Sequence, residues 1–209
     1  MRLFRDFTSR NDRRTKSIFE KNLIVKIILI VFVFVSISNS IVIAKGGKAK
    51  MKTLIVYYSL TGNTEIAAKE IAKKYNADLV KLEDLKQRLK FVLYVYGSYC
   101  ALKDKVWDIK SIDINLKDYS RVFVGSPVWA GSPVPAINTF LTNANFTGKE
   151  VIPFVTMGGR NPSKSIPKMS SKIISRGGRI AGSFAIQTGR KKPEEVSAKA
   201  KEEILKFVK

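Results

Sequence analysis

The segment most informative about the fold reads Thr53-Leu54-Ile55-Val56-Tyr57-Tyr58 and continues as Ser59-Leu60-Thr61-Gly62-Asn63-Thr64. Its first half is a short run of β-branched and aromatic residues, which is typical of a buried parallel strand. Its second half is a turn rich in hydroxyl side chains, and residues 65–75 then carry apolar side chains at helical spacing. The segment therefore predicts a strand, a tight loop and the first turn of a helix in direct succession.

The rest of the chain continues this alternation of strands and helices. Further strands are predicted over residues 77–82, 121–124, 150–155 and 179–186, and helices over part of 86–103 and over 134–141, 163–175 and 193–208. In the helix within 86–103, we expect one apolar face formed by Leu89, Val92, Leu93 and Tyr96. Strands that alternate with helices form a parallel sheet covered on both faces, so the predicted fold class is α/β and doubly wound.

Two features of the composition limit the chemistry that side chains can perform. The 209 residues include no histidine, which excludes Ser-His-Asp and Cys-His catalysis and histidine-bearing zinc sites. Cys100 is the single cysteine, which excludes an internal disulfide, and we expect it to be a small buried side chain. A bound cofactor is therefore the expected source of any chemistry.

The chain is basic along its whole length. It holds 38 Lys and Arg against 17 Asp and Glu, a formal charge of +21. Residues 1–50 contribute +8 (11 basic, 3 acidic) and residues 51–209 contribute +13 (27 basic, 14 acidic). Such a charge attracts acidic partners, anionic membranes or nucleic acid. Because the sequence contains no nucleic-acid-binding motif, we expect a solvated basic surface and no nucleic-acid partner.

The first fifty residues have the composition of a targeting or membrane segment. Seven basic residues precede Leu23, residues 23–44 are largely apolar, and the longest unbroken apolar run covers residues 27–35. Three interpretations remain open: a signal peptide cleaved after Ala44, an uncleaved anchor over residues 23–44, or a misplaced start with Met51 as the true first residue. The first two predict an exported or membrane-associated protein and the third a cytoplasmic one. In each case residues 51–209 form the functional domain.

Three predicted loops follow strands at one edge of the sheet, where ligands bind in open parallel sheets. In the first, Ser59–Thr64, backbone N–H groups at a helix start can hold a phosphate, although an N-cap by Thr61 or Asn63 is the alternative. In the second, Ser126–Ser132, Trp129 is either a flat surface for an aromatic ring or a packing residue. In the third, Thr156–Arg160, Gly158-Gly159 either approaches a ligand closely or makes a turn. Together the loops describe one pocket for a phosphate, a linker and a planar ring.

Three motifs in these loops resemble those of the flavodoxin family. Residues 55–64, with Ala67, Ala68 and Ile71 behind them, resemble the family's signature. Residues 124–131, Val-Gly-Ser-Pro-Val-Trp-Ala-Gly, and their continuation to Leu141 are similar to the second flavin loop and helix of the short members. Thr156-Met157-Gly158-Gly159 resembles the third loop, with Met157 where serine is more usual. The resemblance covers residues 51 to about 205.

The resemblance implies a fold, a cofactor and a set of cofactor-binding residues. The fold is a five-stranded parallel sheet of order 2-1-3-4-5, and the cofactor is non-covalent FMN. Its phosphate is expected on Ser59, Leu60, Thr61, Gly62, Asn63 and Thr64, its ring beside Pro127, Val128, Trp129, Ala130 and Gly131, and its pyrimidine side on Thr156, Met157, Gly158 and Gly159. No catalytic side chain and no metal are predicted.

Two functions are compatible with these residues. The first is an electron carrier between a reductase and an acceptor, with redox partner proteins that are expected to be acidic because the domain is basic. The alternative is an FMN-dependent oxidoreductase that takes hydride from NAD(P)H and reduces a quinone or flavin, which needs a second pocket over the flavin face. Residues 86–105, with Tyr94, Tyr96, Tyr99 and Cys100, are where contacts to a partner or substrate are expected.

Overall fold

The structure, a computed structural model, describes residues 52–86, 88–159 and 164–206. The three interpretations of residues 1–50, the place of Arg160 in the third loop and the end of the last predicted helix lie outside the described residues. Within the described ranges, no helix is both long enough and apolar enough to cross a membrane.

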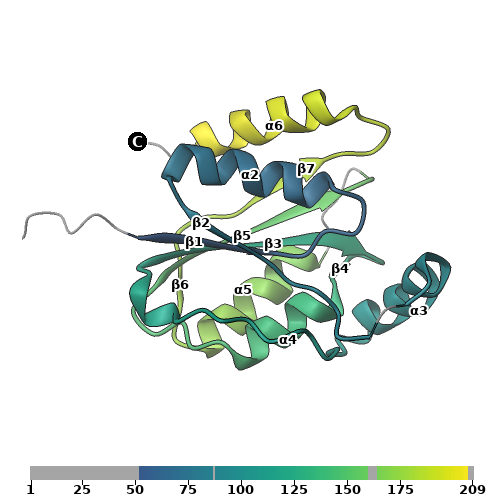
Figure 1. Ribbon diagram of the computed structural model, residues 1–209, viewed down its shortest axis with the longest axis horizontal. Coiled ribbons are helices and arrows are strands. Elements are labelled where there is room, and N and C mark those ends of the chain that lie inside the picture. Colours follow the sequence, from purple (N-terminus) through teal and green to yellow (C-terminus); the bar gives the residue numbers. More distant parts are fainter. Residues whose placement is uncertain (1–51, 87, 160–163, 207–209) are drawn as a thin grey trace, which may run out of the picture. The chain divides into compact units, whose positions relative to one another are not determined.

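A parallel sheet forms the centre of the domain (Figure 1). Its strand order is β2-β1-β3-β5, and β5 pairs at its other edge with both β6 and β7. Val56 of β1 lies opposite Val124 of β3, and Val124 lies opposite Pro153 of β5. The bounds of these strands are β1 Thr53–Tyr57, β2 Asp78–Lys81, β3 Arg121–Trp129, β5 Glu150–Met157, β6 Arg179–Ile180 and β7 Phe184–Gln187.

The predicted α/β class is confirmed, and the strand count needs two corrections. The predicted fifth strand is divided into β6 and β7, and the short strand β4 (Ser132–Pro133) adds an antiparallel pair to β3. Counted with β6 and β7 as one divided strand, the predicted strands follow the order 2-1-3-4-5.

Pro153 explains why the fifth strand is divided. Across this edge the carbonyls of Val151 and Met157 accept hydrogen bonds from the N–H groups of Ala181 and Thr188. Backbone groups alternate between the two edges of a strand, so residue 153 faces the same neighbour as residues 151 and 157. Proline has no N–H group to donate, and the ladder is therefore interrupted between β6 and β7.

Helices cover both faces of the sheet (Figure 1). On one face lie α2 (Asn63–Tyr75) and α6 (Pro193–Leu205), and on the other lie α4 (Pro135–Asn143) and α5 (Ser165–Ser175). Side chains alternate along β3, so Phe123 joins the cluster under α2 and α6, while Val122 and Val124 join the cluster under α4 and α5. Both faces of the sheet are thus buried, as the apolar runs of its strands require.

The helix α3 (Lys90–Leu102) lies beyond the carboxyl ends of the strands rather than on a face of the sheet (Figure 1). The connector after it instead covers β1 and β2: Ile109, Ile112 and Ile114 pack against the cluster that contains Leu54 and Val56. A 3-10 turn, Leu116–Asp118, ends this connector.

The predicted apolar face of α3 is wrong except at Leu93. The residues that α3 buries are Leu93, Gly97, Cys100 and Ala101, whereas Leu89, which precedes the helix, is 79% exposed. Almost every position of this helix is apolar, so the sequence offered several faces, and the small residues at 97 and 101 decided which one packs. Cys100 is buried, as predicted.

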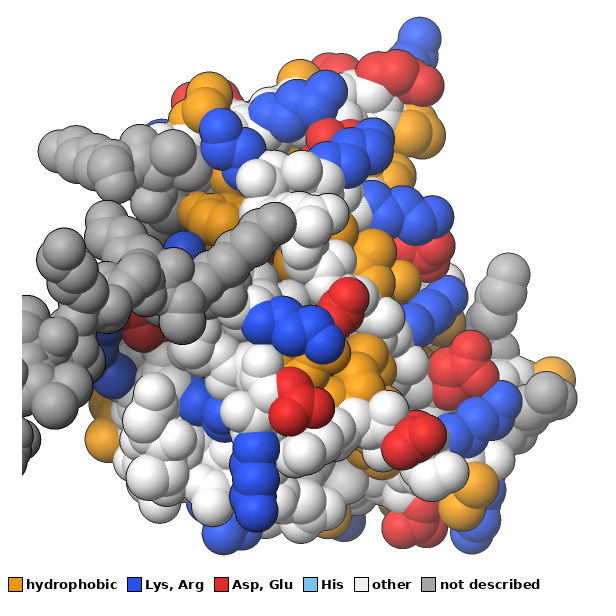
Figure 2. Space-filling view, turned by 60° about the vertical axis from the view of Figure 1, so that its left-hand side comes forward, with side chains coloured by type: hydrophobic (Ala, Val, Ile, Leu, Met, Phe, Trp, Pro, Cys, Tyr) orange, Lys and Arg blue, Asp and Glu red, His pale blue; other side chains and the backbone are white. Residues whose placement is uncertain are grey.

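The charged side chains are dispersed on the face that Figure 2 displays. Lys and Arg lie there among Asp, Glu and apolar side chains instead of forming one basic stripe. Several of these charges are paired across the surface, as in Lys81 with Glu65 and Lys110 with Glu83. This distribution is typical of a solvated surface.

Candidate functional site

A cavity of about 360 Å³ lies at the carboxyl edge of the sheet. Its volume is in the range typical of small-molecule sites. Residues in the last part of two strands or directly after a strand line it, from β1, β3, β5 and β7, and one residue comes from α3. The lining residues are Leu60, Thr61, Asn63, Tyr94, Pro127, Val128, Trp129, Thr156, Met157, Gly158, Thr188, Gly189 and Arg190.

The structure brings nine of the fifteen predicted site residues to this cavity. They are Leu60, Thr61, Asn63, Pro127, Val128, Trp129, Thr156, Met157 and Gly158. The other six, Ser59, Gly62, Thr64, Ala130, Gly131 and Gly159, lie in the same loops but do not form its wall. That any of the fifteen binds a cofactor stays a prediction.

The first loop leaves the N-terminus of α2 open. Ser59 Oγ accepts hydrogen bonds from the N–H groups of Gly62 (3.1 Å) and Glu65 (3.3 Å), which folds the loop onto itself. Gly62 is the N-cap, with φ of 92°, and has no side chain to cap the helix, so the alternative of an N-cap by Thr61 or Asn63 is wrong; Ser59 Oγ instead satisfies one N–H group of the first turn, that of Glu65. Within the described part of the chain, the N–H groups of Asn63 and Thr64 have no hydrogen-bond acceptor. The helix thus presents unsatisfied donors beside the cavity.

A buried hydroxyl pair ties the first loop to the third. Thr64 Oγ1 lies 2.7 Å from Thr156 Oγ1, and both side chains are buried. Thr64 is therefore a structural link between α2 and β5. Thr156, predicted as a loop residue, belongs to the end of β5, as does Met157.

The second loop is shorter than predicted, because β3 continues to Trp129. Pro127, Val128 and Trp129 lie in the strand, and Ala130-Gly131 is a two-residue turn into β4. Both turn residues have positive φ, 46° and 74°, which is the geometry of a tight hairpin. The Gly131 carbonyl accepts a hydrogen bond from Lys164 N–H (3.1 Å), which ties the turn to the segment before α5.

Trp129 is a packing residue that also lines the cavity, and its contact with a ligand ring stays a prediction. It is 7% exposed and packed against Trp107 and Tyr58, with ring centroids 6.3 and 6.0 Å away. Gly97 of α3 permits this packing, because a Cβ atom there would lie 2.5 Å from the indole ring. Trp129 therefore connects α3 to the wall of the cavity.

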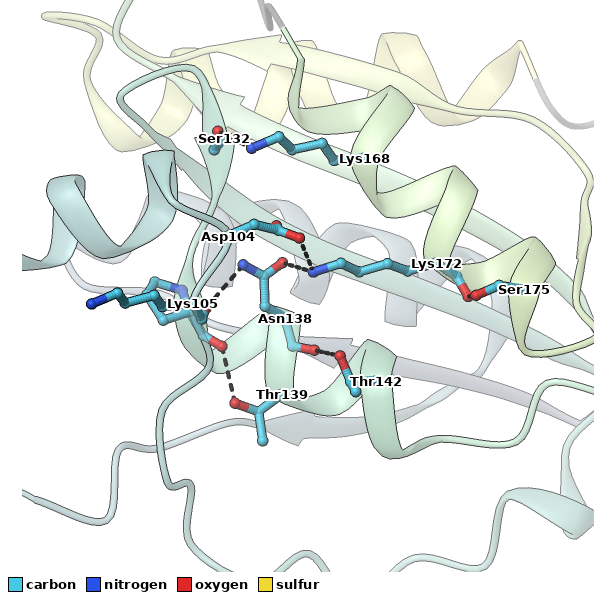
Figure 3. A network of polar contacts seen from close by, with 10 residues as sticks. Asp104, Lys105, Ser132, Asn138, Thr139, Thr142, Lys168, Lys172 and Ser175 are labelled. Carbon is cyan, nitrogen blue, oxygen red and sulfur yellow. Dashed lines mark hydrogen bonds and ion pairs between the residues drawn. The ribbon is translucent and has the colours of Figure 1, made fainter.

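A polar network holds the second loop and the segment after α3 in place (Figure 3). Lys172 Nζ donates to Asn138 Oδ1 (3.0 Å) and pairs with Asp104 (2.9 Å), and the Asn138 amide donates to the carbonyl of Lys105 (3.2 Å). The hydroxyl of Thr139 donates to the Trp107 carbonyl (2.6 Å), and Lys168 Nζ donates to Ser132 Oγ (3.0 Å). Hydrogen bonds from α4 and α5 thus fix the positions of Trp107 and β4.

A fourth loop, which the sequence interpretation missed, completes the cavity. Thr188, Gly189 and Arg190 follow β7, and a Cβ atom at Gly189 would lie 2.2 Å from the Gly158 carbonyl. Arg190 has a positive φ of 55° and no ion-pair partner among the described residues. The same signal that marked the other loops, polar and glycine residues directly after a strand, was present here. Tyr94 of α3, named from the sequence as a residue for partner or substrate contacts, lines the cavity although it was not among the predicted cofactor-binding residues.

A group of titratable side chains lies behind Trp129. The Tyr58 hydroxyl donates to Asp84 Oδ2 (3.1 Å), and the Arg88 guanidinium lies 3.9 Å from the same oxygen and 4.1 Å from the centre of the Trp107 ring. Burial raises the pKa of the Asp84 carboxyl, and it also raises the pKa of Tyr58. The cavity lining itself contains no carboxylate and no lysine, and the described residues hold no cluster suited to a metal ion. Tyr58, Asp84 and Arg88 are thus not among the residues that line the cavity.

An open parallel sheet with a cavity beyond the carboxyl ends of its strands is the arrangement in which doubly wound α/β proteins bind their ligands. The sequence model of the flavodoxin family matches residues 52–182, more than half of the chain, and the chain therefore belongs to that family. The resemblance inferred from the loops is confirmed.

Solved structures agree with this assignment. A Bacteroides uniformis protein described as a flavoprotein is 25% identical, with a TM-score of 0.61 over 71% of this chain and 96% of that one. A flavoprotein from Lactobacillus acidophilus, solved in complex with FMN, is 24% identical, with a TM-score of 0.58 over 76% of this chain and 99% of that one. A comparison with curated protein sequences gives no match.

Proposed function

We propose that this protein binds FMN in the cavity at the carboxyl edge of the sheet and works as an electron-transfer flavoprotein. The observation that carries the proposal is the open N-terminus of α2, with its unsatisfied N–H groups at Asn63 and Thr64, beside a cavity with an aromatic wall. A helix N-terminus of this kind favours a phosphate, because its N–H groups and dipole both stabilise negative charge. Membership of the flavodoxin family supports the same assignment.

The loops leave room for such a ligand. Cβ atoms added at Gly62, Gly158 or Gly159 would meet no atom within 4 Å, so the space in front of the first and third loops is open. At the end of β3, Pro127, Val128 and Trp129 provide an apolar part of the wall against which a planar ring can lie. The unpaired Arg190 adds a positive charge to the same cavity, which raises its affinity for an anionic group.

The chain contributes binding and orientation rather than proton transfer. FMN, when bound, supplies one- and two-electron chemistry. The first loop would hold the phosphate, the end of β3 would contact the ring, and the third loop would contact its pyrimidine side. Because no carboxylate lines the cavity, the surrounding amides and apolar side chains would set the redox properties of the site.

The absorption spectrum of the purified full-length protein tests the proposal. We expect the absorption bands of a flavin in the blue part of the visible spectrum. After heat denaturation, the supernatant should contain FMN and not FAD. Protein that carries no flavin and does not bind added FMN would refute the proposal.

A pair of threonine variants then tests the phosphate assignment. Thr61→Ala should weaken FMN affinity about tenfold or more, because a hydrogen bond to a charged group contributes about 1.5–3 kcal/mol. Thr147→Ala, at an exposed threonine outside the cavity, is the matched control. Equal affinities of the two variants would remove the Thr61 hydroxyl from the site.

Tyr94 favours a second candidate, an FMN-dependent oxidoreductase that uses NAD(P)H and a quinone or flavin acceptor. Its ring lines the cavity from α3, so the wall includes a surface that the strand-end loops do not supply. Steady-state oxidation of NAD(P)H by the flavin-loaded protein, with and without a soluble quinone, separates the two functions. A carrier should show no turnover without an added reductase, whereas an oxidoreductase should turn over and lose activity in Tyr94→Ala.

A further inference from the structure

The exposed apolar side chains of this protein are concentrated in one region. Among the described residues, thirteen large hydrophobic side chains are exposed, and ten of them fall within residues 85–106. Single exposed apolar side chains scattered over a surface are ordinary, but a concentration of this kind marks an interaction site. We call the following set the α3 surface: Leu89, Phe91, Val92, Tyr94, Val95, Tyr96, Tyr99 and Leu102.

Helix α3 is not an amphipathic helix with a polar side facing solvent. Residues 91–102 of α3 contain no charged side chain, and the helix buries only a narrow strip, which includes Leu93 and Gly97. Phe91 is 78% exposed and Tyr94 is 54% exposed. A helix that is apolar on all sides belongs inside a protein core or in contact with lipid. Because α3 lies beyond the carboxyl ends of the strands, the described domain does not surround it with other elements (Figure 1).

Basic residues flank this apolar helix. Three exposed lysines lie on either side of the apolar stretch, Lys86, Lys103 and Lys105, whereas Arg88 is half-buried and paired with Asp84, and Asp104 is the acidic residue beside them. Asp104 is already paired with Lys172 at 2.9 Å, so it does not neutralise the flanks. Lys105 lies over the ring of Tyr99, 5.3 Å from its centre, next to the apolar surface. The region therefore combines apolar and aromatic side chains with a positive rim.

We propose that the α3 surface docks onto the headgroup region of an anionic lipid bilayer. Phe, Leu and Val side chains gain free energy on entering the acyl boundary, tyrosines favour the interface, and a lysine-rich rim is attracted by anionic headgroups. With 13 residues, α3 is roughly 20 Å long, too short to cross a hydrocarbon core of about 30 Å, so it lies in the plane of the interface.

Docking in this way fixes the orientation of the domain on the membrane. Tyr94 belongs both to the α3 surface and to the wall of the cavity. Docking through the α3 surface therefore brings the part of the cavity wall formed by Tyr94 to the membrane surface. The proposal depends on α3 alone and does not require that the cavity binds FMN.

A position-resolved fluorescence experiment on the full-length chain tests the proposal. An environment-sensitive thiol probe is attached at Phe91→Cys and, as matched control, at Lys74→Cys on the exposed side of α2, with Cys100→Ala in both proteins. We expect a blue shift at position 91 on addition of phosphatidylglycerol-containing vesicles, no shift at position 74, and a much smaller shift with phosphatidylcholine alone. Replacing Lys86 or Lys103 by Gln should weaken the response at position 91 roughly fivefold each.

Reading the probe at one position distinguishes docking of α3 from membrane recruitment by another part of the chain. Sedimentation with vesicles but no shift at position 91 would overturn the proposal. A shift that depends on protein concentration and not on lipid would also overturn it, and would indicate a second copy of the chain as the occupant. A shift caused only by an acidic protein would overturn it in favour of a protein partner. Circular dichroism verifies that each labelled protein is folded.

Discussion

Helices α2 and α3 have the same length, 13 residues, and both border the cavity, yet they differ in how their apolar side chains are divided between core and solvent. Helix α2 separates its residues by type: Ala67, Ala68 and Ile71 are buried, while its charged side chains lie outside and form ion pairs. Helix α3 shows no such separation: it buries the strip of Leu93, Gly97, Cys100 and Ala101, and most of its other apolar side chains are exposed. The comparison teaches that α2 buries its apolar face and exposes charge, whereas α3 buries one apolar strip and exposes apolar surface on its other sides.

The largest expected effect is a truncation in the anchored helix. Ile71→Ala removes a fully buried side chain and should lower the free energy of unfolding by about 2–5 kcal/mol. Phe91→Ala removes an exposed side chain and should change it by no more than about 0.5 kcal/mol. Urea denaturation of both variants checks this. Comparable losses at the two positions would contradict the distinction between the helices.

A second variant tests the contact that holds α3. Gly97→Ala places a Cβ atom 2.5 Å from Trp129 and 3.1 Å from Trp107, so the rings must move, and we expect a loss of about 1–3 kcal/mol despite the better helix propensity of alanine. The tryptophan emission spectrum should change as well. Ser98→Ala, one position away, is the control and should leave both stability and emission close to those of the wild type.

The hydroxyl pair beneath the cavity tests how α2 is tied to β5. Thr64→Val leaves the Thr156 hydroxyl buried without this partner and should cost about 1–2 kcal/mol. Thr64→Val combined with Thr156→Val removes both polar groups and should cost less than the sum of the single changes. A strictly additive double variant, measured by chemical denaturation, would show that the two hydroxyls do not interact.

The smallest effect concerns the charged side of α2. Hydrogen bonds from Lys69 and Lys81 to Glu65 hold the pKa of that carboxyl below its ordinary value. Because the folded pKa is lower than the unfolded value of about 4.3, the stabilisation is present above that pH and is lost as the pH falls through the folded pKa. Glu65→Gln should therefore weaken the dependence of the unfolding free energy on pH in the acid range. An unchanged pH dependence in Glu65→Gln, measured by urea denaturation at several acid pH values, would contradict this role of Glu65.

Local sequence patterns determined most of the architecture. The apolar runs of β1, β3 and β5 and the spacing of Ala67, Ala68 and Ile71 placed strands and helices correctly, because burial on a sheet or under a helix imposes those periods directly on the sequence. The three strand-end loops also converge on one cavity, since carboxyl ends of parallel strands share an edge.

Long-range contacts decided the remaining features. Pro153 interrupts β5's pairing only because its missing N–H faces the fifth strand, and the turn at Ala130-Gly131 extends β3 because residues 132 and 133 fold back onto it. The sequence of α3 determined that the helix is apolar, but not which face packs, because apolar residues occupy nearly every position. The tertiary structure made that choice where Gly97 meets Trp129, a contact across 32 residues that no local pattern encodes.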